Sequence, residues 1–341
     1  MEKNKRTVTC GELTAADTGR SVTLNGWVHR LRDHGGVKFI NLRDRYGITQ
    51  VVVDEDAAEE VRRTTEKLHN EYCIAVTGVV RGRPEEMKNP EMITGEIEVA
   101  AESVEVLSAC ETLPFSIDEK SEAREELRQK FRYLDLRSFS MQRKIRLRSD
   151  VSTETRKYLT RLGFLEIETP TLIRSTPEGA RDFLVPSRIN QGRFYALPQS
   201  PQLFKQLLMV SGFDRYFQLA HCFRDEDARG DRQVEHTQID IEMSFVSKDD
   251  VFEVVEGLMA HVFKETLGVD VPIPFPRLGY HDAMNRYGSD KPDLRYDLEM
   301  VDVSSVVAES DFQVFKKVVA GGGVVKALRV SGGEGYSRKQ I

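Results

Sequence analysis

A charged stretch around residue 224 carries side chains whose types and spacing suit the binding of an anionic substrate. Arg224 and Glu226 follow an alternating segment that ends at Phe223, so at strand spacing their side chains share one face. An arginine fork can hold a phosphate through two parallel hydrogen bonds, and a carboxylate can accept from amines. The spacing therefore indicates a substrate-binding position at the end of a strand.

A second alternating segment, residues 237–245, follows the charged stretch. Gln238, Asp240 and Glu242 share one face of it. The two segments predict a hairpin with a long, highly charged loop. The polar face of the second segment suggests a substrate-binding surface. The alternative is a solvated loop with surface ion pairs, which contribute little to stability.

The elements that must position these residues fall into two groups. From Ser21 to Leu107 the apolar residues mostly alternate, which is typical of half-buried strands. Strands are expected over 21–28, 37–43, 48–53, 72–81 and 95–106, with a helix over 57–68. Three strands, one helix and two strands predict a five-stranded OB-fold β-barrel. A generic small antiparallel barrel without nucleic-acid function is the alternative.

The second group begins after a connector. Residues 109–138 lack strand patterning and predict a hinge, and a helix is expected from Phe139 to Leu162, ended by Gly163. Strands near 164–167, 193–196 and 216–223 alternate with helices near 200–211 and 249–267. This mixture predicts an α+β domain with a largely antiparallel sheet.

Composition limits the classes of protein that remain. The chain has 341 residues and a formal charge of −6, so any nucleic-acid site must be a local basic patch. No apolar run approaches the 18 or so residues that a membrane span needs, and no signal peptide is expected. The four cysteines form no Cys-x-x-Cys pair, which argues against a zinc ribbon or a disulfide framework. We expect no metal site and a cytoplasmic location.

The string Phe223-Arg224-Asp225-Glu226 resembles motif 2 of the class II aminoacyl-tRNA synthetases. Other strings resemble further segments of the aspartyl-tRNA synthetases of bacterial type, and the resemblance covers essentially the whole chain. They are 223–245 as a whole, 163–172 (motif 1, at the dimer interface), 175–183 (the mobile loop that closes over the amino acid) and 197–206 (the aspartate-binding segment). An OB domain in front is the order expected of the aspartate, asparagine and lysine subgroup.

The resemblance implies a set of site residues. Arg224 should hold the α-phosphate of ATP and a substrate carboxylate oxygen, and Glu226 should face the adenine or the tRNA end, so these two are the catalytic candidates. The residues expected to bind ATP are Arg224, Asp225, Glu226, Gln233 and His236, with His236 in place of the aromatic ring that usually covers adenine. The residues expected to bind the amino acid are Glu178, Gln202, Lys205, Arg224 and Asp240.

Two of these groups have a clear chemical rationale. Glu178, Gln202 and Asp240 can surround the substrate ammonium, because two carboxylates and an amide satisfy its donors. Lys205 should meet the side-chain carboxylate and thereby select aspartate over asparagine, since an ammonium gains more from a carboxylate than from a neutral amide.

The resemblance also implies a tRNA site on the barrel. Single-stranded bases stack on aromatic rings while polar side chains read their edges. Phe39 fits the stacking position and Gln50 a base reader; the other candidates are Arg32, His34 and Glu98. We expect tRNA(Asp) as a partner. Because members of the family differ around His34, we hypothesise tRNA(Asn) as a second partner.

The implied reaction is the activation of L-aspartate by ATP with Mg²⁺, followed by transfer to the 3′ end of tRNA. No protein nucleophile is needed, because the acceleration comes from positioning and from neutralising developing charge. A homodimer formed through motif 1 is expected, with no membrane association. The rival hypotheses are an asparaginyl-tRNA synthetase and a non-catalytic RNA-binding paralogue.

The resemblance divides the chain further. The expected parts are an anticodon-binding OB domain (1–108), a hinge (109–138), the first part of the catalytic domain (139–286) and the start of an α+β insertion domain (287–341). Motif 3, with the second ATP arginine, should lie beyond Ile341. We therefore expect a truncated form that keeps some anticodon-arm binding and has little ATP–pyrophosphate exchange.

Overall fold

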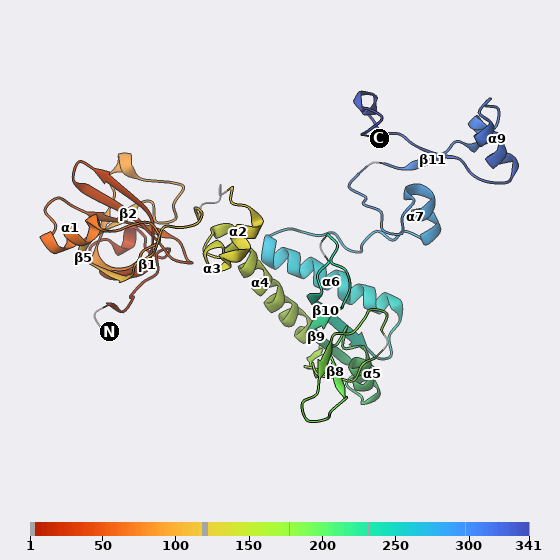
Figure 1. Cartoon of the computed structure of the whole chain (residues 1–341), viewed down its shortest axis with the longest axis horizontal. Coiled ribbons are helices and arrows are strands. Elements are labelled where there is room, and N and C mark those ends of the chain that lie inside the picture. Colours follow the sequence, from red (N-terminus) through yellow and green to blue (C-terminus); the bar gives the residue numbers. More distant parts are fainter. Residues whose placement is uncertain (1–3, 118–121, 177, 231, 297, 341) are drawn as a thin grey trace. The chain divides into compact units, whose positions relative to one another are not determined.

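The computed structural model describes residues 4–117, 122–176, 178–230, 232–296 and 298–340. Its contacts divide the chain into two compact units, residues 1–153 and 154–341 (Figure 1).

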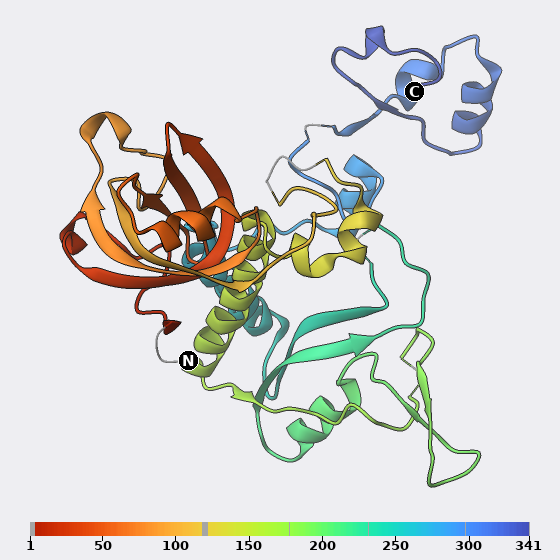
Figure 2. The ribbon, with the colours of Figure 1, turned by 60° about the vertical axis from the view of Figure 1, so that its left-hand side comes forward.

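The first unit contains a closed five-stranded barrel. Its strands are β1 (Ser21–His34), β2 (Val37–Arg43), β3 (Ile48–Val53), β4 (Cys73–Gly82) and β5 (Ile97–Ser108), with helix α1 (Glu59–Glu66) between β3 and β4. The order around the barrel is β1-β2-β3-β5-β4, and β4 pairs with β1 to close it (Figure 2). The predicted OB-fold is confirmed in strand number, helix position and topology.

The barrel core is made of the inward-facing residues of these strands. Leu24, Ile40, Val51, Ile74 and Val99 are at most 1% exposed and belong to one apolar cluster. Alternation buries every second side chain, which is why the sequence pattern located the strands. Short 3₁₀ turns occur at Ala15–Asp17 and Glu85–Met87.

The connector folds as two short helices, α2 (Glu125–Lys130) and α3 (Arg132–Asp135). Directly after them, Arg137 donates to Glu71 Oε2 at 2.9 Å, and Arg43 donates to the same oxygen at 2.8 Å. The Arg137 guanidinium also lies 4.9 Å from the centre of the Trp27 ring. The connector is therefore attached to the barrel by a charged group and an aromatic ring. Helix α4 (Phe139–Arg161) follows, and Gly163 beyond it has the left-handed φ of +81°.

The second unit contains a three-stranded sheet of order β10-β9-β6. Strands β9 (Arg215–Phe223) and β10 (Glu235–Met243) form the predicted antiparallel hairpin. The short strand β6 (Leu165–Glu166) pairs parallel to β9, so this sheet is mixed in direction. Strands β7 (Leu184–Pro186) and β8 (Phe194–Ala196) form a separate antiparallel pair.

Two helices accompany these strands. Helix α5 (Gln202–Val210) contacts both β9 and β10. Helix α6 (Lys248–Leu267) begins with a capping box, in which Ser247 and Asp250 satisfy the first turn, and ends at Gly268 in the left-handed conformation. The predicted α+β class is confirmed.

The remaining segment also mixes helices with a small sheet. It contains α7 (Tyr280–Tyr287), α8 (Ser304–Val307), α9 (Gln313–Ala320) and the antiparallel pair β11 (Met300–Asp302) and β12 (Lys326–Leu328). A 3₁₀ turn at Gly333–Gly335 follows. The sequence pattern here was hard to read because these elements are short.

Candidate functional site

The centre of the candidate site is an ion pair between α5 and β10. Lys205 Nζ lies 2.9 Å from Asp240 Oδ1 and 3.3 Å from Glu242 Oε2. The side chains of Lys205 and Asp240 are 11% and 3% exposed. Burial alone would lower the pKa of Lys205, but the hydrogen bond and charge of Asp240 and the charge of Glu242 outweigh it and raise that pKa. Lys205 therefore carries a firmly held positive charge in this site.

The two carboxylate oxygens of Asp240 have different surroundings. Oδ1 accepts from Lys205 and, at 2.9 Å, from Gln238 Nε2. Oδ2 is buried and has no hydrogen-bond partner among the residues that the structure describes. A buried, unpaired acceptor is costly unless a ligand supplies the donor. Oδ2 is thus the best-placed acceptor for a cationic ligand group.

Four charged residues that are remote in sequence act on one buried thiol. Cys222 is fully buried on β9, and its pKa is raised chiefly by burial. The charges of Arg224 and Lys205 lower this pKa, while those of Asp240 and Glu178 raise it. Glu178, Lys205, Arg224 and Asp240 therefore all lie near Cys222.

Glu178 is held by hydroxyl groups from two segments. Ser200 Oγ donates to Glu178 Oε2 at 2.7 Å, and Thr176 Oγ1 donates to Oε1 at 3.3 Å. Nearby, the Gln199 side chain bonds the backbone of Ala180 in both directions, at 3.0 and 2.9 Å. Residues 199–200 thus tie down the loop that carries Glu178.

The charged stretch after β9 has its backbone ordered by neighbouring segments. The Arg224 amide donates to the Val234 carbonyl at 2.8 Å, and the Asp225 amide donates to the Arg181 carbonyl at 3.0 Å. The side chains of Arg224, Asp225, Glu226 and Gln233 are exposed. They are therefore accessible to a ligand.

Two further predicted residues are placed by their elements. His236 lies directly opposite Cys222 in the β9–β10 register, so it shares the face of Asp240. Gln202 begins α5, one turn before Lys205.

Sequence reasoning missed several groups that organise the site. Gln199 and Ser200 hold the Glu178 loop, and Glu242 is the second carboxylate on Lys205. The sequence placed Glu242 on the strand face of Asp240 but assigned it no role. The contacts of Gln199 and Ser200 join segments about 20 residues apart in the chain, for which the sequence carries no periodic signal.

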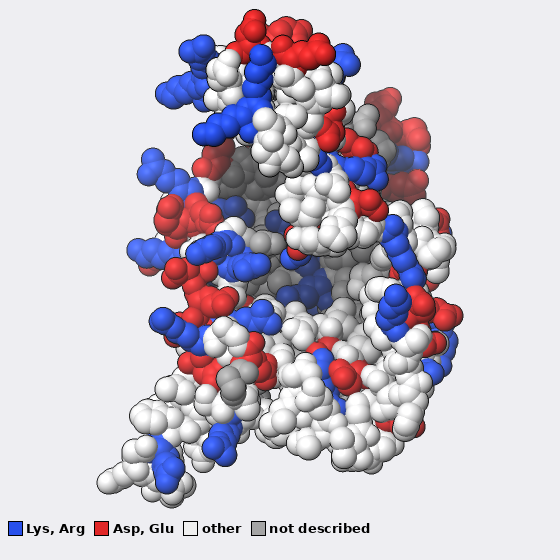
Figure 3. Space-filling model, turned by 90° about the vertical axis from the view of Figure 1, so that its right-hand side faces the viewer, with Lys and Arg blue, Asp and Glu red and all other residues white. Residues whose placement is uncertain are grey.

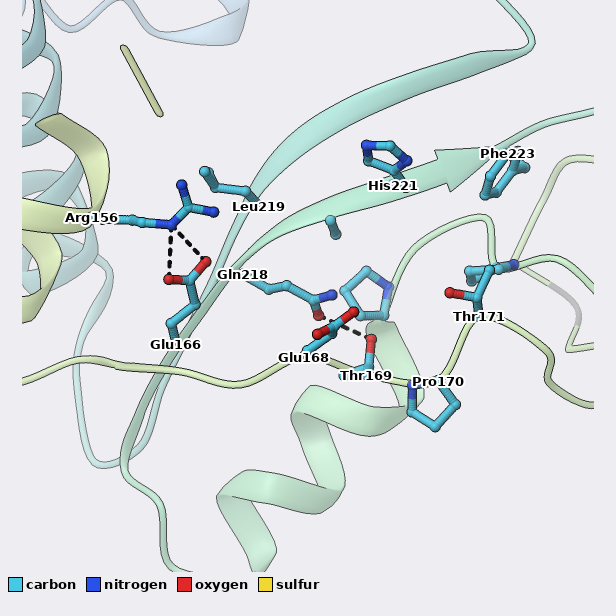
Figure 4. Close-up of a pocket in the computed structure, with 13 residues that line it drawn as sticks. Arg156, Glu166, Glu168, Thr169, Pro170, Thr171, Gln218, Leu219, His221 and Phe223 are labelled. Carbon is cyan, nitrogen blue, oxygen red and sulfur yellow. Dashed lines mark hydrogen bonds and ion pairs between the residues drawn. The ribbon is translucent and has the colours of Figure 1, made fainter. Parts of the chain in front are cut away.

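A hollow of about 600 Å³ lies beside this site on the β6 side of the sheet (Figure 4). Glu168, Thr169 and Pro170 line it on one side, and the β9 residues Gln218, Leu219, Ala220, His221 and Phe223 line it on the other. None of the predicted amino-acid or ATP residues lines it among the described residues. The volume of this hollow would make it a candidate substrate site. The charged side chains of Lys205, Asp240 and Glu242 instead favour the region around Asp240 as the place where a charged substrate binds.

The predicted tRNA residues also come together, on the surface of the barrel. Arg32 and Phe39 are direct cross-strand partners, and the rings of His34 and Phe39 are 6.3 Å apart. Gln50 donates to Glu98 Oε2 at 2.9 Å, and Arg32 donates to Gln50 Oε1 at 3.4 Å. All five residues therefore belong to one connected group, in which Gln50 and Glu98 are buried and Arg32 and His34 are exposed.

Two residues that the sequence did not single out complete this surface. Arg81 Nε donates to Glu98 Oε1 at 2.8 Å. Its two terminal nitrogens donate to the two carboxylate oxygens of Asp54, at 2.7 and 3.0 Å. The hydrogen bond to Asp54 is the main reason that the pKa of Arg81 is raised. Arg81 thus holds the Glu98 carboxylate in a fixed orientation.

The surface charge is mixed. Figure 3 shows acidic and basic side chains side by side over the face that it presents. Among the described residues, no helix is both long and apolar enough to pass through a bilayer. The same residues contain no cluster of three or more histidine, cysteine or acidic side chains arranged to hold a metal ion.

Comparison with known families matches both units. The model for tRNA synthetases class II (D, K and N) matches residues 124–326. The model for the OB-fold nucleic acid binding domain matches residues 22–107. The second match agrees with the barrel, and the first covers more than half of the chain.

Individual relatives agree with these families. The chain is 60% identical to an aspartate–tRNA(Asp/Asn) ligase of Treponema denticola, over 100% of this chain and 58% of that protein. It is 55% identical to an aspartate–tRNA ligase of Bacillus licheniformis, over 98% of this chain and 57% of that protein. The chain therefore spans somewhat more than half the length of these relatives.

Solved structures give the same result. A crystal structure of asparaginyl-tRNA synthetase from Pyrococcus horikoshii, complexed with asparaginyl-adenylate, matches with a TM-score of 0.69 and 27% identity. The match covers 78% of this chain and 59% of that one. By its family match and its relatives, this chain belongs to the class II tRNA synthetases of the aspartate, lysine and asparagine group.

Proposed function

We propose that this chain forms the anticodon-binding and amino-acid-binding part of an aspartate–tRNA ligase. The observation that carries the proposal is the position of Lys205 between Asp240 and Glu242, with Glu178 and Arg224 acting on the same neighbouring thiol. Relatives at 55–60% identity that are named as ligases of aspartate and tRNA support the same activity.

The first step of the reaction joins the amino acid to AMP. The aspartate α-carboxylate attacks the α-phosphorus of ATP, and pyrophosphate leaves. Arg224 neutralises charge that develops on the phosphate, while Glu178, Gln202 and Asp240 hold the ammonium. Glu226, Asp225, Gln233 and His236 contact the nucleotide in this proposal.

The second step transfers the activated amino acid to tRNA. A ribose hydroxyl at the tRNA 3′ end attacks the mixed anhydride, and AMP leaves. Both steps depend on holding the reactants together in the correct orientation. The charged side chains of the site can do this without a protein nucleophile. Mg²⁺, if bound with the phosphates of ATP, would supply further neutralisation of their charge.

Selection of aspartate over asparagine is assigned to Lys205. Its ammonium is held at a fixed place by two carboxylates, and it gains more from a substrate carboxylate than from a neutral amide. An asparaginyl-tRNA synthetase is the rival hypothesis within the family. It is supported by the structural similarity to an asparaginyl-tRNA synthetase solved with asparaginyl-adenylate.

The barrel surface is assigned to the tRNA anticodon. Phe39 stacks on a base, Gln50 and Glu98 read base edges, and Arg32 and His34 complete the contact surface. Two partners are proposed, tRNA(Asp) and tRNA(Asn), because a relative at 60% identity is named for both. Charging of purified tRNA(Asp) alone, with tRNA(Asn) left uncharged by aspartate, would rule out the second partner.

Other parts of the proposal concern the assembly. We place the anticodon-binding domain at 1–108, the hinge at 109–138, the first part of the catalytic domain at 139–286 and the start of an insertion domain at 287–341. A homodimer through residues 163–172 and a cytoplasmic location complete the proposal.

ATP–pyrophosphate exchange tests the function. The complete product of the gene should exchange pyrophosphate in the presence of L-aspartate and much less with L-asparagine. The same assay is run on the 341-residue chain, which spans 58% of the length of the Treponema denticola relative. Exchange with asparagine alone would favour the rival synthetase, and no exchange by the complete product would favour a non-catalytic RNA-binding protein.

A further inference from the structure

The strands beneath the amino-acid site carry a hydrogen-bond arrangement in which Gln218 is central. Gln218 lies directly opposite Asp240 in the β9–β10 register, so the two side chains share one face of the sheet. Gln218 Oε1 accepts from the Tyr216 hydroxyl at 2.8 Å and from Thr169 Oγ1 at 2.9 Å. Both lone pairs of this amide oxygen are therefore in use.

Tyr216 is the neighbour that could otherwise donate to Asp240. It is fully buried, and its pKa is raised chiefly by burial and next by the charge of the nearby Asp240 carboxylate. The hydroxyl has one proton to donate. In the structure this proton goes to Gln218, and Asp240 Oδ2 keeps no partner among the described residues.

We propose that Gln218 is a positioning residue that keeps Asp240 Oδ2 free for the ammonium of the substrate. By accepting the Tyr216 proton, Gln218 prevents this hydroxyl from occupying the oxygen that the ligand needs. The proposal rests on the proposed function, because it assigns the substrate ammonium to Asp240. It adds Gln218 to the residues that determine amino-acid affinity, although its side chain need not touch the ligand.

The same contacts allow a purely structural role, which must be separated from this one. Thr169 lies in the segment that lines the hollow of Figure 4, where its hydroxyl points to Gln218. Gln218 could therefore serve just to attach residues 168–170 to β9. In that case its loss would disturb the site whether or not Tyr216 has a hydroxyl.

A double-variant test distinguishes the two roles. Gln218→Met keeps the length of the side chain and removes the acceptor, so the Tyr216 hydroxyl turns to Asp240. We expect the dissociation constant for L-aspartate to rise about tenfold, the effect of losing one hydrogen bond to a charged group. Adding Tyr216→Phe removes the competing donor and should restore the affinity to within about threefold of the wild type.

Two further measurements serve as controls. Tyr216→Phe alone and Thr169→Val alone should each change the aspartate affinity by less than about threefold, because neither leaves a new donor on Asp240. The affinity for ATP should not change in any variant. All affinities are measured by isothermal titration calorimetry on the 341-residue chain.

The outcomes separate the inference from the function on which it rests. Equal weakening in Gln218→Met and in the double variant would overturn the inference and assign Gln218 a structural role, and so would an unchanged affinity in Gln218→Met. If the wild-type chain bound ATP but no L-aspartate, the proposed aspartate site would be wrong, and the inference would fall with it.

Discussion

Lys205 and Asp240 form a nearly buried ion pair in which the lysine also reaches Glu242, so one ammonium faces two carboxylates. The pair joins α5 to β10, two elements that are separate in the chain. A lysine held in this way has little freedom to move toward bulk water. Its charge is available to a ligand at a fixed place in the site.

Replacing Lys205 should abolish the distinction between aspartate and asparagine. In Lys205→Gln the affinity for L-aspartate should fall by about 10- to 100-fold, since a charge-assisted hydrogen bond is lost. The affinity for L-asparagine should change by less than about threefold, because an amide does not depend on that charge. Calorimetry with both amino acids measures the difference.

Lys264→Gln is the matched control. Lys264 pairs with Asp270 at 2.8 Å on the surface of the same unit, and its side chain is 53% exposed. This variant should bind both amino acids as the wild type does. An equal loss of aspartate and asparagine affinity in Lys205→Gln would contradict the proposed selectivity.

The raised pKa of Lys205 predicts how this selectivity depends on pH. A group whose pKa is higher in the folded than in the unfolded protein stabilises the fold fully below the unfolded pKa, about 10.4 for lysine. The contribution is lost as the pH rises through the folded pKa, which lies higher here because Asp240 and Glu242 outweigh burial. The preference for aspartate should therefore persist from pH 7 to pH 10. A steep loss of preference near pH 8, measured by calorimetry, would show that Lys205 is not so held.

Phe39 should dominate the binding of RNA by the barrel. Stacking of one base on an aromatic ring is worth about 1–3 kcal/mol, so Phe39→Ala should weaken an anticodon stem–loop by about 5- to 100-fold. Fluorescence anisotropy with a labelled stem–loop measures this. Tyr46→Ala is the control, because Tyr46 is an exposed ring, 42%, elsewhere on the same barrel. A similar loss in both variants would mean that the RNA does not use the Phe39 surface.

The barrel could be predicted from sequence because its signals are local. The alternation around Leu24 and Ile40 can be recognised from neighbouring residues, and so can the turn at Gly35 and Gly36. The structure has strands and a turn at these positions. The parallel pairing of Leu165 with Tyr216 is not local, and no periodic signal predicts it. The mixed direction of the second sheet was therefore missed.

The candidate site was located through resemblance, and its internal contacts came from the structure. Glu178, Lys205 and Asp240 lie on a loop, a helix and a strand, so no spacing rule links them. The hydrogen bonds of Gln199 to the Ala180 backbone and of Arg81 to Asp54 join chain segments that are far apart in sequence. They therefore depend on tertiary packing. Such partners become visible only when the fold is known.

Two glycines of β4 provide a matched test of the barrel packing. A Cβ at Gly78 would lie 2.1 Å from the Ala100 carbonyl oxygen, whereas a Cβ at Gly82 would meet nothing within 4 Å. Gly78→Ala should lower the free energy of unfolding by about 1–3 kcal/mol or more. Gly82→Ala should change it by less than about 1 kcal/mol. Denaturant unfolding followed by circular dichroism compares them, and equal stability of the two variants would contradict the β4–β5 register.

The attachment of the connector to the barrel can be followed through Trp27, the single tryptophan of the chain. Arg137 lies over the Trp27 ring and donates to Glu71, whose side chain is 3% exposed. Arg137→Ala removes both contacts, so we expect altered tryptophan emission and a loss of about 1–3 kcal/mol of stability. Glu71→Gln should cost more, about 3–5 kcal/mol, because it leaves the buried Arg43 without its carboxylate.

Arg45→Ala is the control for the loss of an arginine from an aromatic ring. The Arg45 guanidinium lies 4.9 Å from the Tyr46 ring centre in the same unit, and no ion pair of Arg45 is found among the described residues. This variant should keep the emission spectrum and the unfolding midpoint of the wild type. If Arg137→Ala behaved like Arg45→Ala, the connector would not be held by Glu71 and Trp27. A shifted spectrum in Arg137→Ala with partial recovery in Arg137→Lys would instead separate the charge on Glu71 from the planar stacking on Trp27, because lysine supplies only the first.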